Sequence, residues 1–84
     1  MSNVEYMKPS IDFAMCVLKV LEDQAEPSAG EIASAVSLVM RRHVELGEVE
    51  SGIRFLRSFM RYDILDYPDV DVTRYSLVTT GDAA

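Results

Sequence analysis

The sequence predicts an α+β fold in which three helices are followed by a two-stranded β-hairpin. Apolar residues recur at helical spacing in three blocks, and after Tyr62 the spacing changes to the alternation of strands. A chain of 84 residues has room for one domain, and 49% hydrophobic with 26% charged residues is a globular composition. We therefore expect an N-terminal arm at 1–9, a folded domain at 10–81 and a short tail at 82–84.

The first helix is expected to begin at Ser10, whose hydroxyl can accept a hydrogen bond from a backbone N–H of the first turn. Asp12, Lys19 and Asp23 leave only a narrow polar side, which predicts a helix packed from two directions. Its apolar positions are Ile11, Phe13, Ala14, Val17, Leu18, Val20 and Leu21.

A second helix is predicted after Pro27, because proline disfavours helical backbone at the residue before it. Ser28 and Glu31 have the spacing of a capping box, in which each side chain bonds the other residue's backbone N–H. This helix is expected to run to about Leu46, with Gly47 as a left-handed stop. Its apolar positions are Ile32, Ala35, Val36 and Val39.

The third block, "EVESGIRFLRSFMRY" at 48–62, predicts an amphipathic helix. At 100° per residue, Arg54, Arg57 and Arg61 fall on one narrow arc, which predicts a solvent-facing ridge of arginines. Gly52 lies on the apolar face, where it costs about 1 kcal/mol relative to alanine but permits close packing. That face comprises Val49, Gly52, Ile53, Phe55, Leu56, Phe59 and Met60.

The C-terminal part predicts an antiparallel hairpin of strands 63–67 and 73–79 with a tip at 68–72. A lone hairpin is marginal in water, so Tyr75 and Leu77 should lie on the helices. We expect Leu77→Ala to cost about 2 to 4 kcal/mol, because it removes a buried side chain.

Charge is distributed unevenly along the chain. The net charge is −6, yet the segment 41–61 holds five arginines and three acidic residues, while the segments on either side are acidic. If the protein contacts an anionic polymer, this segment should make the contact.

The element order resembles that of the winged helix-turn-helix domains of small bacterial, archaeal and phage transcription regulators. The resemblance covers about 10–81 and includes the helix-to-strand transition "GIRFLRSFMRYDILDY" and the closing "RYSLVTTG", with Tyr75, Leu77 and Gly81 in an aromatic-x-Leu-x-x-x-Gly pattern. It implies that the third helix lies in the major groove of double-stranded DNA and that the hairpin is the wing.

The resemblance also implies candidate DNA-binding residues. Arg74 would contact a phosphate beside the wing. Arg41 and Arg42, at the end of the second helix, could contact the DNA backbone or could simply favour the negative helix terminus. The candidates on the third helix are Ser51, Arg54, Arg57, Ser58 and Arg61.

Catalytic, metal and membrane functions are not expected. Cys16 and His43 are the only cysteine and histidine, too few for a typical transition-metal site, and no glycine-rich phosphate loop or nucleophile–base pair stands out. We expect no cofactor and no enzyme activity. The longest apolar run is interrupted by Lys19 and too short for a bilayer, and the N-terminus has no secretion signal, which favours the cytoplasm.

Two functions stay open. The first is a sequence-specific DNA-binding transcriptional regulator. We expect it to be a homodimer, because binding to two half-sites on the DNA multiplies the discrimination between DNA sequences. The arm at 1–9 or the first helix would make the two-fold contact. The second is an acidic winged-helix module that binds a protein partner and no DNA, which the net charge and the acidic wing sequence "DYPDVDV" favour.

Overall fold

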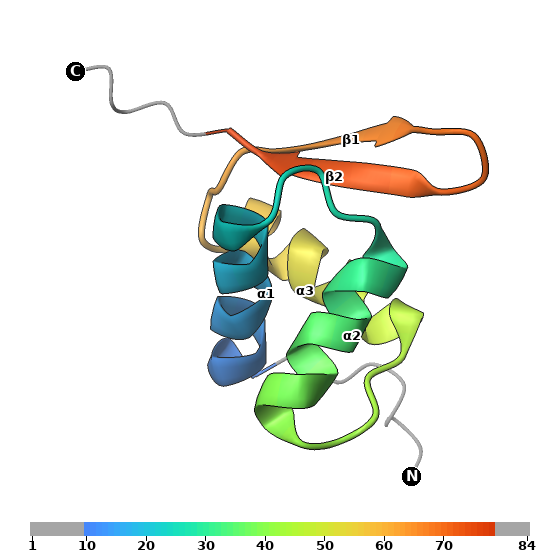
Figure 1. Cartoon of the computed structure of the whole chain (residues 1–84). Coiled ribbons are helices and arrows are strands. Elements are labelled where there is room, and N and C mark those ends of the chain that lie inside the picture. The colour runs from blue at the N-terminus through green and yellow to red at the C-terminus, as the bar shows by residue number, and fades with distance from the viewer. Residues whose placement is uncertain (1–9, 79–84) are drawn as a thin grey trace, which may run out of the picture.

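The computed structural model describes residues 10–78 and has the predicted α+β architecture. Figure 1 shows the hairpin lying across one end of the three helices, which is a winged-helix layout. The predictions for the arm at 1–9, for Gly81 and for the tail fall outside the described residues. The elements are α1 (Ile11–Asp23), α2 (Ala29–Met40), α3 (Leu46–Ser58), β1 (Ile64–Pro68) and β2 (Thr73–Leu77).

The first two helices begin where the sequence predicts. The N–H of Phe13 donates to the hydroxyl of Ser10 at 3.0 Å. Ser28 and Glu31 form the complete capping box, with the Glu31 N–H bonded to the Ser28 hydroxyl at 3.2 Å and the Ser28 N–H bonded to the Glu31 carboxylate at 2.9 Å. These caps satisfy N–H groups that have no partner within the helix.

The predicted end of the second helix is wrong. The helix ends at Met40, and Arg41 takes the left-handed conformation expected of Gly47, with φ of 60°. Gly47 instead lies in the first turn of α3, which starts after a Glu45–Glu48 capping box. Ending α2 early lets Val44, 3% exposed, reach the core while the polar residues before it stay in solvent.

The core lies between the three helices and the hairpin. As predicted, α1 packs against two helices, α2 and α3. Gly52 is the point of closest approach, because a Cβ there would lie 3.1 Å from Phe13 Cε2 and 3.3 Å from Val17 Cγ2. Three residues predicted on core-facing sides are exposed instead: Ile11 at the start of α1 is 62% exposed, Val39 near the end of α2 is 67% exposed, and Phe59, just after α3 ends, is 60% exposed.

The hairpin pairs antiparallel as predicted, with Ile64 opposite Leu77 and Pro68 opposite Thr73. β1 is shifted by one residue from the predicted 63–67, and β2 ends at Leu77 instead of continuing towards the predicted end at 79, which lies outside the described residues. The backbone N–H of Tyr75 also donates to the carbonyl of Pro27 at 3.0 Å, and Ser28 and Arg74 form an isolated β-bridge, so the α1–α2 connection lies alongside β2. Tyr75 is buried, and this confirms that the hairpin lies on the helices.

Leu77 packs against the core but is only half-buried. We therefore expect Leu77→Ala to lower the free energy of unfolding by about 1 to 2 kcal/mol, below the 2 to 4 kcal/mol of a fully buried leucine. Leu65→Ala is the control, since Leu65 is 52% exposed on the paired strand and should change stability by less than about 0.5 kcal/mol. Urea unfolding of both variants measures the two changes in the free energy of unfolding. Equal losses in Leu77→Ala and Leu65→Ala would contradict the packing of Leu77 against the core.

Candidate nucleic-acid interface

The outer face of α3 consists of Gly47, Ser51, Arg54 and Ser58, which we call the reading face. Gly47, Arg54 and Ser58 are exposed and Ser51 is half-buried. These positions lie opposite the buried face of the helix, because the two sets are separated by about half a turn at 100° per residue. The reading face therefore presents Arg54 among small residues, and the exposed side chain of Glu50 borders it about 40° away around the helix.

Arg54 makes no ion pair with any residue in the described part of the chain. Its side chain borders an open groove of about 180 Å³ between α3 and the hairpin, also lined by Glu50 and Tyr75. Burial, with Glu50 and Asp66 nearby, raises the pKa of the Tyr75 phenol, so its hydroxyl stays protonated at neutral pH. Because Arg54 is exposed and has no ion-pair partner among the described residues, its guanidinium can donate hydrogen bonds to an external acceptor.

Arg61 does not belong to a helical ridge, which corrects the prediction. The helix ends at Ser58, and Arg61 is left-handed with φ of 63°. The Tyr62 N–H donates back to the Leu56 carbonyl at 3.0 Å, a closure typical of a chain that leaves a helix through one left-handed residue. Arg61 is exposed beyond the end of α3, on the turn that leads to the hairpin.

Arg57 joins α3 to the hairpin instead of pointing into solvent. Its guanidinium donates two hydrogen bonds to the Ile64 carbonyl, from Nη2 at 2.6 Å and from Nε at 3.0 Å. Nη2 also pairs with the Asp66 carboxylate at 3.3 Å. Three contacts to β1 fix the angle between the helix and the hairpin, so Arg57 positions α3 relative to β1.

Arg74 has a similar role at the base of the hairpin. Its Nε bonds the Asp69 carboxylate at 2.9 Å, and its Nη1 reaches the Glu26 carbonyl at 3.0 Å and the Glu31 carboxylate at 3.2 Å. The hydrogen bond to the Asp69 carboxylate is the largest cause that raises the pKa of Arg74. Desolvation lowers this pKa, the charge of Glu31 raises it, and the net effect is an increase. With its charge matched by two carboxylates, Arg74 connects the hairpin to the start of α2.

The Asp69–Arg74 pair predicts a pH dependence of stability. The hydrogen bond from Arg74 holds the pKa of Asp69 below its ordinary value of 3.8. A carboxyl whose pKa is lower in the folded state stabilises the fold above its unfolded pKa, and this contribution disappears as the pH falls through the folded pKa. We expect Asp69→Asn to lower the melting temperature at about pH 6, and the difference from wild type to shrink as the pH falls below the ordinary pKa of Asp69. A difference that stays the same over this pH range would contradict the pairing.

The two arginines after α2 differ in their contacts. Arg42 pairs with Glu48 at 2.9 Å, donates to the His43 carbonyl at 3.0 Å and lies over the Phe13 ring, 5.7 Å from its centroid. These contacts hold the connection between α2 and α3. Arg41 is exposed and makes no ion pair within residues 10–78.

The hairpin tip is acidic and partly apolar. Asp69 and Asp71 flank Val70, which is 89% exposed, and the Asp69 N–H donates to the Val72 carbonyl at 2.7 Å. Since Arg74 is paired at the base, the tip has little positive charge to offer a phosphate. Sequence reasoning missed these pairings. Their only signal was that four aspartates lie between the arginines of the segment 57–74.

Two absences complete the description of residues 10–78. No group of three or more His, Cys, Asp or Glu side chains in that range could hold a metal ion. None of its helices combines the length and the apolar character that crossing a membrane requires. Comparisons with protein-family models, curated protein sequences and solved structures found no match to this chain.

Proposed function

We propose that this chain is a sequence-specific DNA-binding regulator, and not an enzyme, in which α3 enters the major groove. The observation that carries the proposal is the reading face: Arg54 is exposed and unpaired within the described residues, between Ser51 and Ser58. At 13 residues, α3 is about 20 Å long, and a major groove about 12 Å wide admits a helix.

Small side chains around one arginine suit a helix that must approach base edges closely. Arginine can donate two parallel hydrogen bonds to O6 and N7 of guanine, and serine can bond to several bases. Ser51 lies one turn before Arg54, and Ser58 lies one turn after it. The proposal therefore assigns base contacts to these three residues.

The remaining arginines divide into two groups under this proposal. Arg57, Arg74 and Arg42 position the hairpin and the α2–α3 connection through the contacts described above. Arg61 and Arg41 are exposed and unpaired in the described part of the chain, and they are the candidates for phosphate contacts. Two or three phosphate contacts imply weak binding to random DNA and a shallow salt dependence.

Selection of binding sites from a randomised duplex pool tests the proposal. Wild-type protein at about 50 mM salt should enrich a short motif containing guanine, and log affinity for that motif should fall against log salt with a slope of about −2 to −3. Arg61→Ala should reduce the slope by about one and leave the motif unchanged. A pool that shows no enrichment over several rounds would overturn the proposal.

A second candidate, a protein-interaction module, is favoured by the hairpin tip. Val70 is 89% exposed between two aspartates, a combination that suits a basic and apolar protein surface better than DNA. If the duplex pool shows no enrichment and Val70→Ser abolishes capture of a protein partner while Arg54→Ala does not, this candidate replaces the first.

A further inference from the structure

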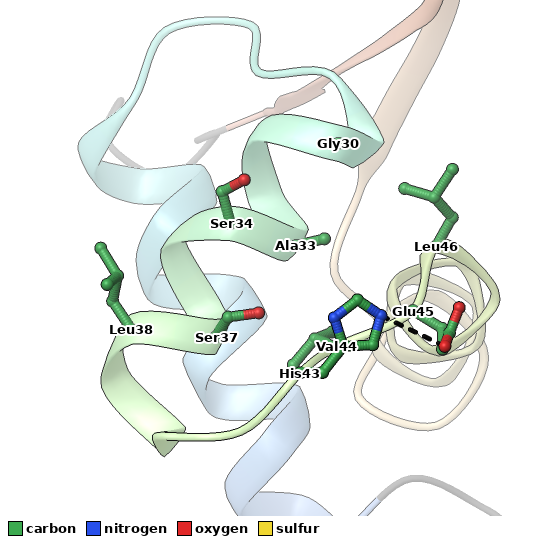
Figure 2. A pocket seen from close by; sticks show the side chains of 9 residues that line it. All are labelled: Gly30, Ala33, Ser34, Ser37, Leu38, His43, Val44, Glu45 and Leu46. Atoms are coloured by element: carbon green, nitrogen blue, oxygen red, sulfur yellow. Dashed lines mark ion pairs between the residues drawn. The ribbon is translucent and has the colours of Figure 1, made fainter.

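The outward face of α2 is unusually apolar near its C-terminal end. Leu38 is 81% exposed, and Ser34 and Gly30, one and two turns earlier on the same side of the helix, are also exposed. In Figure 2 Leu38 points away from the helix and away from both His43, in the α2–α3 connection, and Leu46, at the start of α3. A leucine this exposed leaves most of its apolar surface in water.

Hollows flank this face on both sides. One, of about 520 Å³, lies between α2 and the start of α3 and is shown in Figure 2. The other, of about 570 Å³, lies between α2 and the end of α1, with Gln24, Glu31 and Ala35 among its lining residues. Gly30, Ser34 and Leu38 line both hollows. The face therefore has a projecting leucine and, two turns away, a depression of small residues.

This arrangement is complementary to itself. Leu38 follows Ser34 by four residues and Gly30 precedes it by four, so each lies about 6 Å from Ser34 along the helix axis. If two copies of α2 pack antiparallel about a two-fold axis at Ser34, Leu38 of each copy meets the Gly30–Ser34 segment of the other. A large side chain then sits opposite a residue that has none, at both ends of the contact.

The charges at the two ends of α2 match the same arrangement. Arg41, exposed and unpaired within residues 10–78, follows the C-terminal end, and the exposed residues Glu26 and Glu31 flank the N-terminal end. Antiparallel packing brings Arg41 of each copy towards Glu26 of the other, whereas parallel packing would place the two Arg41 side chains together. Opposite charges across an interface favour one orientation.

We propose that the outward face of α2 is the contact between two copies of this chain, with Leu38 of each copy seated between Gly30 and Ser34 of the other. This places the two-fold contact on α2 and not on the first helix. The contact does not use the reading face, which belongs to α3, and it is tested without DNA; Arg41 is the one residue that the dimer contact and the proposed phosphate contacts share.

Sedimentation equilibrium without DNA tests the contact over about 1 to 200 micromolar protein. Wild type should be a dimer at the upper end of this range. Leu38→Ser should raise the dissociation constant about a hundredfold, because both copies lose a buried leucine. Val39→Ser is the matched control: Val39 is also exposed, at 67%, but lines neither hollow, so its dissociation constant should stay within about threefold of wild type.

The variant Gly30→Leu should block the dimer contact and leave the fold of the monomer intact. A Cβ at Gly30 would have only the Ser28 hydroxyl within 4 Å, at 3.9 Å, so the monomer should accept a side chain there, while the hollow would be filled. We expect an unchanged circular dichroism spectrum and loss of the dimer. Arg41→Glu should weaken the dimer, and adding Glu26→Arg should restore it. A wild-type monomer throughout the range, or equal effects of Leu38→Ser and Val39→Ser, would overturn the proposal.

Discussion

Gly52→Leu should lower the free energy of unfolding by about 3 kcal/mol or more, because the site has no space for a side chain. A Cβ at Gly52 would already lie 3.1 Å from Phe13 Cε2 and 3.3 Å from Val17 Cγ2, and leucine adds three more carbons against α1. Both neighbours are buried, so neither can move into solvent. Urea unfolding followed by circular dichroism measures the loss.

Gly47→Ala is the control in the same helix. No atom lies within 4 Å of a Cβ at Gly47, and its φ is not positive, so alanine should stabilise the protein by up to about 1 kcal/mol through helix propensity. Because Gly52→Leu should lower the stability and Gly47→Ala should raise it, the two variants separate the effect of side-chain packing from that of helix propensity. If Gly52→Leu kept wild-type stability, the close contact between α1 and α3 would be wrong.

Arg54→Ala should lower the affinity for the selected DNA motif by about 10- to 100-fold, the value of one bidentate contact between arginine and a base. The loss should depend on sequence: replacing the contacted guanine should weaken wild type strongly and Arg54→Ala hardly at all. Fluorescence anisotropy with the selected duplex and its single-base variants measures both effects.

Lys19→Ala is the matched control for charge, since it also removes one positive charge. Lys19 is exposed on α1, where it pairs with Asp23 at 3.9 Å, and it lies on a different helix from the reading face. It should change affinity by less than about twofold. Similar losses in the two variants would mean that net charge, and not the reading face, determines binding.

The elements that the sequence could predict are those set by local chemistry. Ser28 and Glu31 specify the start of α2 through a capping box, and Gly52 marks a close approach because nothing else justifies a glycine on an apolar helix face. The alternation ending at Tyr75 and Leu77 identifies the second strand. In each case the deciding residues lie within a few positions of one another.

The arginines could not be assigned from the sequence because their partners depend on the tertiary fold. Helical periodicity placed Arg54, Arg57 and Arg61 on one ridge, but it says nothing of a carbonyl seven residues away or of a helix that ends at Ser58. Arg74 likewise meets Glu31, 43 residues distant in the chain. A long side chain near a helix end can bond to any of several hydrogen-bond acceptors, and only the folded chain determines which of them lie within its reach.

The distribution of arginines gives the hairpin a defined role in the proposed interface. Arg57 fixes β1 to α3, and Arg74 fixes β2 to the start of α2. α3, which carries the reading face, and α2 are therefore each attached to one strand of the hairpin. In the proposed complex the hairpin sets the orientation of α3, and its acidic tip stays away from the phosphates.

Chemical-shift mapping on adding the selected DNA duplex tests the central claim most directly. We predict that the largest backbone amide shifts fall on Ser51, Arg54 and Ser58 of α3, with smaller shifts at Arg41 and Arg61, and that the tip at 69–72 is nearly unaffected. Shifts confined to the hairpin tip, or no shifts in α3 at saturating duplex, would contradict a reading face on this helix.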